Sequence, residues 1–151
     1  MRLKNLPAII AVTLALAASI AATTLSVANP YSHAPKPGDQ VRFDASSSGQ
    51  HSAWAYPDQG WLETFLRASI DASLSGAKSD EQQPAVDRAR QRSLAVDNGT
   101  QGLVGEVHPF RYRDHDDTEV QVLIKQGPLR NHVYWTTAAE LADPNGRKYL
   151  K

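Results

Sequence analysis

The sequence predicts an α+β fold, in which an apolar N-terminal segment and one or two helices precede an antiparallel sheet. Apolar residues recur at helical spacing between Asp58 and Leu74. From Val96 onward, apolar and polar residues alternate with the period of two that is typical of strands. The 151 residues therefore divide into four parts. They are a signal peptide or anchor (1–28), a flexible lead-in (29–50), a helical segment (51–93) and a β-domain (94–151).

The first part has the features of a secretory signal peptide. Arg2 and Lys4 give it a positive start, the run Leu6–Val27 carries no charge, and Ser26-Val27-Ala28 places small residues where a leader peptidase cuts, before Asn29. This pattern predicts a periplasmic or secreted protein. The alternative is an uncleaved membrane anchor, because the apolar run is about as long as the roughly 20 residues that span a bilayer.

Composition limits the possible chemistry. The chain has no cysteine, which excludes disulfides, thiolate metal sites, a cysteine nucleophile and a lipid-modified cysteine. Arg2 and Lys4, two of its 16 basic residues, lie in the leader. The rest of the chain therefore has two fewer basic than acidic residues, of which there are 16, and its formal net charge is −2. Nucleic acid is therefore not an expected partner, because such binding usually needs a concentrated basic patch.

The lead-in and the helical segment contain one predicted strand and two predicted helices. Residues 29–50 are rich in Pro, Ser and Gly, and only Val41–Phe43 alternates as a short strand would. Asp58 is the expected cap of the first helix, and Gly76 is its expected end. A second, thinner helix is expected to start at Ser79 or Asp80.

The C-terminal part predicts an antiparallel meander. A long hairpin is expected from the strand around Leu103–Tyr112, a polar tip at Asp114–Asp117 and the strand Val120–Ile124. After the turn at residues 126–131, His132–Trp135 predicts a third strand. Pro109 indicates a bulge or an edge position, since proline has no amide hydrogen. A turn at residues 143–146 precedes a short closing strand at residues 147–151.

Several motifs of this part resemble bacterial SH3-like small β-barrel domains. They are a Gly-Thr turn before the first strand (Asn98-Gly99-Thr100), a Val-x-Val strand (Val120-x-Val122), a Gly-Pro turn (Gly127-Pro128) and a tryptophan in the last strands (Val133-x-Trp135). The resemblance covers about residues 96–144 and implies an SH3-like antiparallel β-barrel. It departs at Arg130-Asn131-His132, where glycine usually follows the turn.

No catalytic motif is present, and the candidate metal ligands are few. The tip contributes Asp114, His115 and Asp116, but it lacks the glycine and the glutamate that an EF-hand loop needs. His108 and His132 lie on strands expected to be neighbours, where they form a second candidate pair. There is no His-Glu-x-x-His sequence, no nucleophile elbow and no phosphate-binding loop. A non-enzymatic protein without a cofactor is therefore predicted.

Aromatic residues provide the remaining signal for function. In SH3-like barrels an aromatic groove receives extended peptides, so the resemblance implies surface binding residues, for which Tyr112 and Tyr134 are the candidates. Trp135 is expected to point inward. The predicted function is an exported binding module that recognises a cell-envelope peptide, peptidoglycan or protein partner. The alternatives are a metal-binding or hydrolytic envelope protein, and a structural or assembly subunit anchored in the membrane by Leu6–Val27.

Overall fold

The computed structural model describes residues 33–75 and 83–149. The predicted leader at residues 1–28 and the helix boundaries predicted at Gly76, Ser79 and Asp80 lie outside the described residues. Within them the chain is α+β, with two helices and mostly antiparallel strands in two open sheets.

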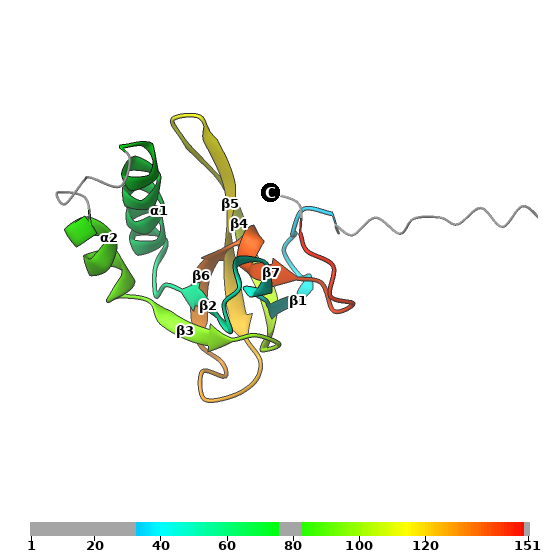
Figure 1. The fold of residues 1–151 in the computed structure, drawn as a ribbon. Helices are drawn as coiled ribbons and strands as arrows, with labels where there is room; N and C mark the ends of the chain where they lie inside the picture. The colour runs from blue at the N-terminus through cyan, green and yellow to red at the C-terminus, as the bar shows by residue number, and fades with distance from the viewer. Residues whose placement is uncertain (1–32, 76–82, 150–151) are drawn as a thin grey trace, which may run out of the picture.

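The larger sheet has five antiparallel strands in the order β6-β5-β4-β1-β7 (Figure 1). Their bounds are Gln40–Phe43 for β1, Gln101–Tyr112 for β4, His115–Ile124 for β5, Val133–Thr137 for β6 and Leu141–Ala142 for β7. The predicted strands at residues 41–43, 103–112, 120–124 and 132–135 are thus confirmed. The two edge strands β6 and β7 are joined only by the 3₁₀ turn η2, Ala138–Glu140. The linker spans about 14 Å at most, whereas the edges of a flat five-stranded sheet would lie about 19 Å apart, so the sheet is curled.

The hairpin β4–β5 is the longest element of this sheet. Its register shifts between Val104 and Val107, which marks a bulge. The turn falls at Arg113-Asp114, because β5 already begins at His115, and Arg113 has a positive φ of 52°. The tip is therefore shorter than the predicted Asp114–Asp117, since Tyr112 and His115 pair across the strands.

Proline is tolerated in β4 because no described strand pairs with one side of β4 at that position. Pro109 is in register with Thr118 of β5. On its other side, β4 pairs with β1 only at Gln101–Leu103. Of the two positions predicted for Pro109, the structure thus shows the edge. The bulge of β4 lies earlier in the strand, between Val104 and Val107.

The helices are an insertion in a two-stranded ribbon. Strand β2, Ser52–Ala55, pairs with β3, Leu94–Asp97, and the chain between them forms α1, Gln59–Leu74, and α2, Gln83–Arg90. In Figure 1 the helices lie side by side to one side of the strands. Strands β1 and β2 both precede residue 94, where the β-domain was predicted to begin, so pairing in the sheets extends across that boundary.

Helix α1 begins where the sequence predicts. The Asp58 side chain accepts a hydrogen bond from the backbone amide of Trp61 at 3.0 Å, which satisfies one of the free donors of the first turn. Leu62 is the fully buried residue of the helix. Phe65 and Leu66 pack around it, so the predicted apolar stripe faces the strands.

Two hydrophobic clusters form the core. The larger one lies inside the curled sheet and is built from Val41, Phe43, Val104, Val120, Val122, Ile124, Tyr134 and Leu141, with smaller residues from β2, β3 and η2. The second lies between α1 and β6 and contains Tyr56, Leu62 and Trp135. Since β6 contributes to both clusters, it is covered on both of its faces.

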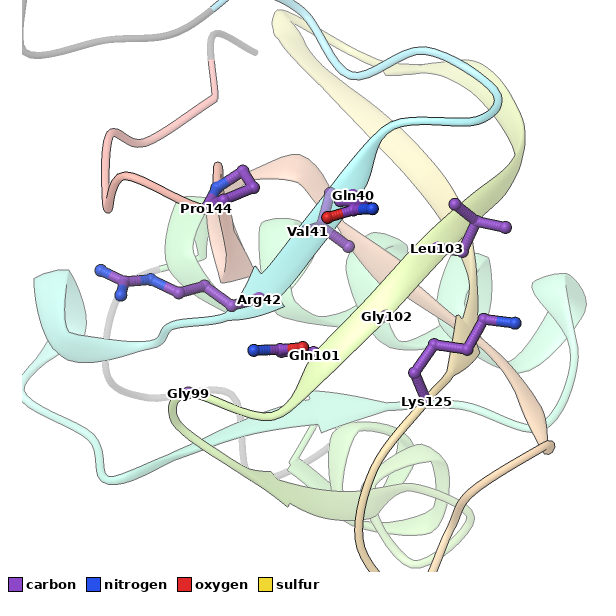
Figure 2. A pocket seen from close by; sticks show the side chains of 9 residues that line it. All are labelled: Gln40, Val41, Arg42, Gly99, Gln101, Gly102, Leu103, Lys125 and Pro144. Carbon is purple, nitrogen blue, oxygen red and sulfur yellow. The ribbon is translucent and has the colours of Figure 1, made fainter.

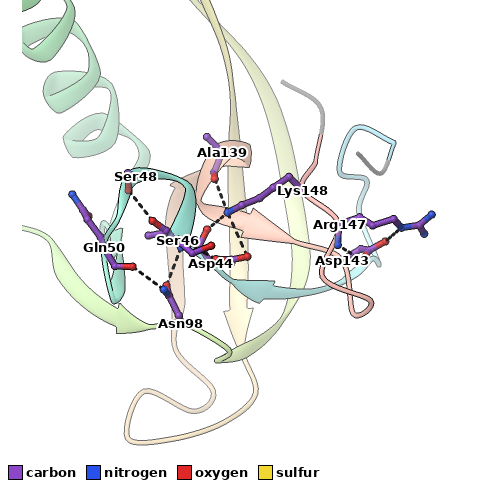
Figure 3. Close-up of polar contacts among 10 residues, drawn as sticks. Asp44, Ser46, Ser48, Gln50, Asn98, Ala139, Asp143, Arg147 and Lys148 are labelled. Atoms are coloured by element: carbon purple, nitrogen blue, oxygen red, sulfur yellow. Dashed lines mark hydrogen bonds and ion pairs between the residues drawn. The ribbon is translucent and has the colours of Figure 1, made fainter. Parts of the chain in front are cut away.

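Polar contacts fix the loops around the first cluster (Figure 3). The Asn98 side chain accepts a hydrogen bond from the amide of Ala45 at 2.8 Å and donates one to the carbonyl of Gln50 at 2.9 Å. Lys148 donates to the backbone carbonyl of Asp44 and lies 3.6 Å from its carboxylate. These contacts connect the ends of β1, β3 and the last described residues.

The last turn is confirmed, whereas the described part of the predicted closing strand, residues 147–149, forms only a bridge. Asp143 holds the turn by accepting hydrogen bonds from the amides of Asn145 and Arg147, both at 2.9 Å, and Gly146 has a φ of 85°. Beyond it, Lys148 forms a single bridge with Ala142.

Candidate functional site

A cleft of about 280 Å³ lies between the helices and the curled sheet. Trp54 and Tyr56 line it from the ribbon side, and Leu62 and Phe65 line it from α1. Thr136, Glu140 and Arg90 contribute polar groups from β6, η2 and α2. We call it the helix–sheet cleft.

Its aromatic wall is positioned by a bridge between the ribbon and the sheet. The amide of Tyr56 donates to the carbonyl of Trp135 at 2.8 Å, and the amide of Trp135 donates back at 2.7 Å. The Tyr56 ring lies 5.5 Å from that of Phe65. Thr136 adds a hydrogen bond from its hydroxyl to the carbonyl of Trp54 at 2.9 Å. The start of α1 is therefore held against β6 by packing and by backbone pairing.

Two buried polar atoms of residues lining this cleft have no hydrogen-bond partner among the described residues, namely Tyr56 Oη and Glu140 Oε2. Tyr56 is only 1% exposed. Burial raises the pKa of Tyr56 well above its usual value, although nearby Arg90 and the Ser93 side chain, which lies near the hydroxyl without reaching hydrogen-bond geometry, oppose the shift. Burial also raises the pKa of Glu140, against the effects of Lys148 and the backbone amide of Trp54. Such groups cost free energy in the free protein, which is a common property of binding sites.

Arginines of α2 and the chain after it cover the tryptophans beside the cleft. The Arg90 guanidinium lies 5.7 Å from the ring centre of Trp54, and that of Arg92 lies 5.2 Å from the ring centre of Trp61. At these distances a cation is attracted by the face of an aromatic ring. The guanidinium of Arg90 thus already lies over the Trp54 ring at the edge of the cleft.

Tyr112, one of the two predicted binding residues, joins the hairpin to α1. Its hydroxyl donates to the Asp71 carboxylate at 3.1 Å, and the Arg67 guanidinium lies 4.9 Å from its ring centre. Arg113 lies 5.5 Å from the same ring and pairs with Asp71 at 2.8 Å. The residue is half-buried, and its polar end is occupied by contacts within the protein.

Tyr134, the other predicted binding residue, is not on the surface. It is 8% exposed and belongs to the larger core cluster, whereas Trp135 is 7% exposed and belongs to the second cluster. Trp135 is buried as predicted, but it lies under α1 on the outer face of the sheet, whereas Tyr134 lies inside the sheet, so alternation assigned the two faces of β6 the wrong way round. Strand β6 has a hydrophobic layer on each face, so successive residues are both buried.

The predicted metal ligands are not assembled. His108 and His132 do not lie on neighbouring strands, because β5 separates β4 from β6. At the hairpin tip, Arg111 binds the Asp116 carboxylate at 2.6 Å, and this hydrogen bond lowers the pKa of Asp116. Across residues 33–75 and 83–149, no three His, Asp or Glu side chains gather closely enough to hold a metal ion, so Asp114 and His115 form no such group.

Sequence reasoning did not select the residues of the helix–sheet cleft. The signal was the alternation of small and aromatic residues in Ala53-Trp54-Ala55-Tyr56, just before the helix cap. That pattern is typical of a strand with one closely packed face, and Ala53 and Ala55 are indeed fully buried.

No family model, curated protein or solved structure matches this chain. In the part of the chain that the structure describes, neither helix combines the length and the apolar character needed to cross a bilayer.

Proposed function

We propose that this protein is an exported, non-enzymatic binding module of the SH3-like type, which receives an extended peptide of a cell-envelope partner in the helix–sheet cleft. The leader features at residues 1–28 support export. The curled sheet supports the barrel, since its edge strands β6 and β7 are only three residues apart in sequence and its first strand lies between β4 and β7. The resemblance of residues 96–144 points to the same class.

The observation that carries the proposal is the pair of buried, unpartnered polar atoms beneath aromatic walls. An extended peptide presents an amide donor and a carbonyl acceptor at every residue. Both atoms are buried in the free protein, so the cleft must open to admit the peptide; a peptide amide would then match Glu140 Oε2, and a peptide carbonyl the hydroxyl of Tyr56. Trp54 and Phe65 supply the apolar contact that peptide grooves use for side chains.

The charges around the cleft favour a basic side chain in that peptide. Asp117 and Glu140 both line the cleft, and the negative charge of Asp117 contributes to raising the pKa of Glu140. A positive group from the peptide would lower the repulsion between the carboxylates of Asp117 and Glu140. Arg90 lies over the ring of Trp54, which shows that this ring can hold a cation. A lysine or arginine side chain of the peptide would take the place of Arg90 there.

Binding can be tested with two random nonapeptide libraries, one with a central lysine and one with a central glutamate. We expect the lysine library to shift the backbone amide NMR signals of Thr136 and Glu140, which line the cleft, in the full chain, and the glutamate library to shift them far less. Trp54→Ala should abolish the response. Leu74→Ala changes an exposed residue at the far end of α1 and should preserve it.

Tyr56→Phe provides a test that keeps the aromatic packing. It removes only the unpartnered hydroxyl, so we expect it to fold and to bind the lysine library about ten-fold more weakly. Equal responses to both libraries, or unchanged affinity in Tyr56→Phe, would contradict the proposal.

A further inference from the structure

A second cleft, of about 290 Å³, lies on the outer face of the larger sheet. Alternation places Val41 and Gly102 on the buried side, and Gln40, Arg42, Gln101 and Leu103 on the opposite side. Pro144 of the last turn and Lys125 after β5 complete its walls (Figure 2). This outer cleft shares no lining residue with the helix–sheet cleft.

Strand register sets two cations in one row across its floor. Arg42 is the partner of Gln101, and the backbone amide of Lys125 donates to the carbonyl of Gln101 at 2.9 Å. The two cationic residues therefore flank Gln101, about 10 Å apart at the backbone. In Figure 2 the guanidinium and the ammonium extend to opposite sides of Gln101, so they do not converge on one point.

Neither cation is neutralised within the described chain. Arg42 and Lys125 form no ion pair or side-chain hydrogen bond with another described residue, whereas the cations Arg67, Arg111, Arg113, Arg147 and Lys148 each pair with a carboxylate. Arg42 is half-buried as a residue, and no other described side chain occupies the five donors of its guanidinium.

The Arg42 guanidinium lies beside the last turn. It passes so close to Gly146 that a Cβ atom there would overlap it. Gly146 has a φ of 85°, a conformation that favours glycine, and the turn is fixed by hydrogen bonds to Asp143. The turn therefore forms the wall of the cleft next to the guanidinium.

We propose that the outer cleft binds a short linear oligoanion, with one negative group on Arg42 and another on Lys125. The backbones of the two residues are about 10 Å apart, and their side chains diverge (Figure 2), so reaching both charges requires an elongated ligand, which a single small anion does not provide. Guanidinium donors match phosphate and carboxylate oxygens, and the amides of Gln40 and Gln101 can donate to the atoms between the two charged ends. The shared chemistry is a chain of oxyanions, from either phosphates or carboxylates.

Calorimetry of the full chain with tripolyphosphate, triglutamate and inorganic phosphate tests this proposal. We expect saturable binding of at least one of the two longer anions, about ten-fold tighter than inorganic phosphate, and a loss of affinity as salt rises from about 20 to about 300 mM. Comparing the two longer probes identifies the oxyanion that the cleft prefers.

Variants separate this site from general electrostatic attraction. Arg42→Ala and Lys125→Ala should each weaken binding about ten-fold. Arg88→Ala removes the same charge from α2, away from the cleft, and should leave the affinity unchanged. No saturable binding of either longer anion, or an equal loss in Arg88→Ala, would overturn the proposal. Trp54→Ala should not affect this binding, so the outcome is independent of the peptide proposal.

Discussion

Glu119 lies under the first turn of α1, and replacing it by glutamine is expected to stabilise the protein at neutral pH. The side chain is 1% exposed. Its Oε2 accepts a hydrogen bond from the Gln59 side chain at 2.7 Å, whereas its Oε1 has no partner among the described residues. Burial raises the pKa of Glu119, with smaller contributions from Glu63 and Asp117. The charged form is therefore the costly one.

The sign of the pH dependence follows from the raised pKa. The folded protein keeps the Glu119 proton to a higher pH than the unfolded chain does, in which glutamate titrates near 4.5. Above that pH the unfolded state loses its proton first, so the free energy of unfolding falls as pH rises through the folded pKa. Glutamine can keep an acceptor for Gln59 and removes this charge. An unpartnered buried charged oxygen costs about 1–3 kcal/mol, so we expect Glu119→Gln to gain about 1–2 kcal/mol at pH 7.5.

Urea unfolding followed by tryptophan fluorescence, at several pH values between 4 and 8 and constant ionic strength, measures this difference. The gain should shrink toward zero at pH 4, where Glu119 is protonated. Asp114→Asn, at the exposed tip of the hairpin, is the control and should change stability by less than about 0.5 kcal/mol throughout. A variant that is less stable at pH 8, or a gain that does not change with pH, would refute the reasoning.

Three further changes test packing and buried hydrogen bonds. Tyr56→Phe removes an unpartnered hydroxyl and should raise the free energy of unfolding by about 1 kcal/mol in thermal denaturation; a loss would mean that the hydroxyl has a partner. Asn98→Ala leaves the buried amide of Ala45 without its partner, whereas the exposed Gln50 carbonyl can bind water, so stability should fall by about 1 kcal/mol in urea, and a neutral effect would contradict the observed bond to Ala45. Gly102→Ala places a Cβ on the Val122 side chain and should lower the melting temperature, with a cost of about 1–3 kcal/mol. Gly105→Ala meets only a flexible glutamine end and should cost less, so equal losses would refute the distinction.

The local elements were predictable because their signals are local. The Asp58 cap acts on the first turn of α1, and the apolar stripe of α1 repeats within a few turns of the same helix. The hairpin β4–β5 follows from the alternation of polar and apolar residues on either side of a polar turn. The pairing of β1 with β7 is not readable in this way, because Arg42 and Ala142 are far apart in the sequence and neither strand carries a motif for the other.

The site was less predictable than the fold. Alternation assigned Tyr134 to solvent, but the helical insertion covers the second face of β6 and buries Trp135 there. Whether a strand has one or two covered faces depends on where α1 packs, and that is a property of the whole fold. The same packing creates the helix–sheet cleft, so Glu140 gains its position only when η2 and α1 are both in place.

The position of β1 between β4 and β7 has a consequence for how the chain folds. The meander β4–β5–β6 joins neighbours in sequence and can form early, whereas β7 must find a strand about 100 residues upstream. Until Leu141 and Ala142 have been synthesised, one edge of β1 has no strand to pair with in the larger sheet. Truncated chains that end before Leu141 would expose that edge, together with Phe43, and would be prone to pair with one another and aggregate.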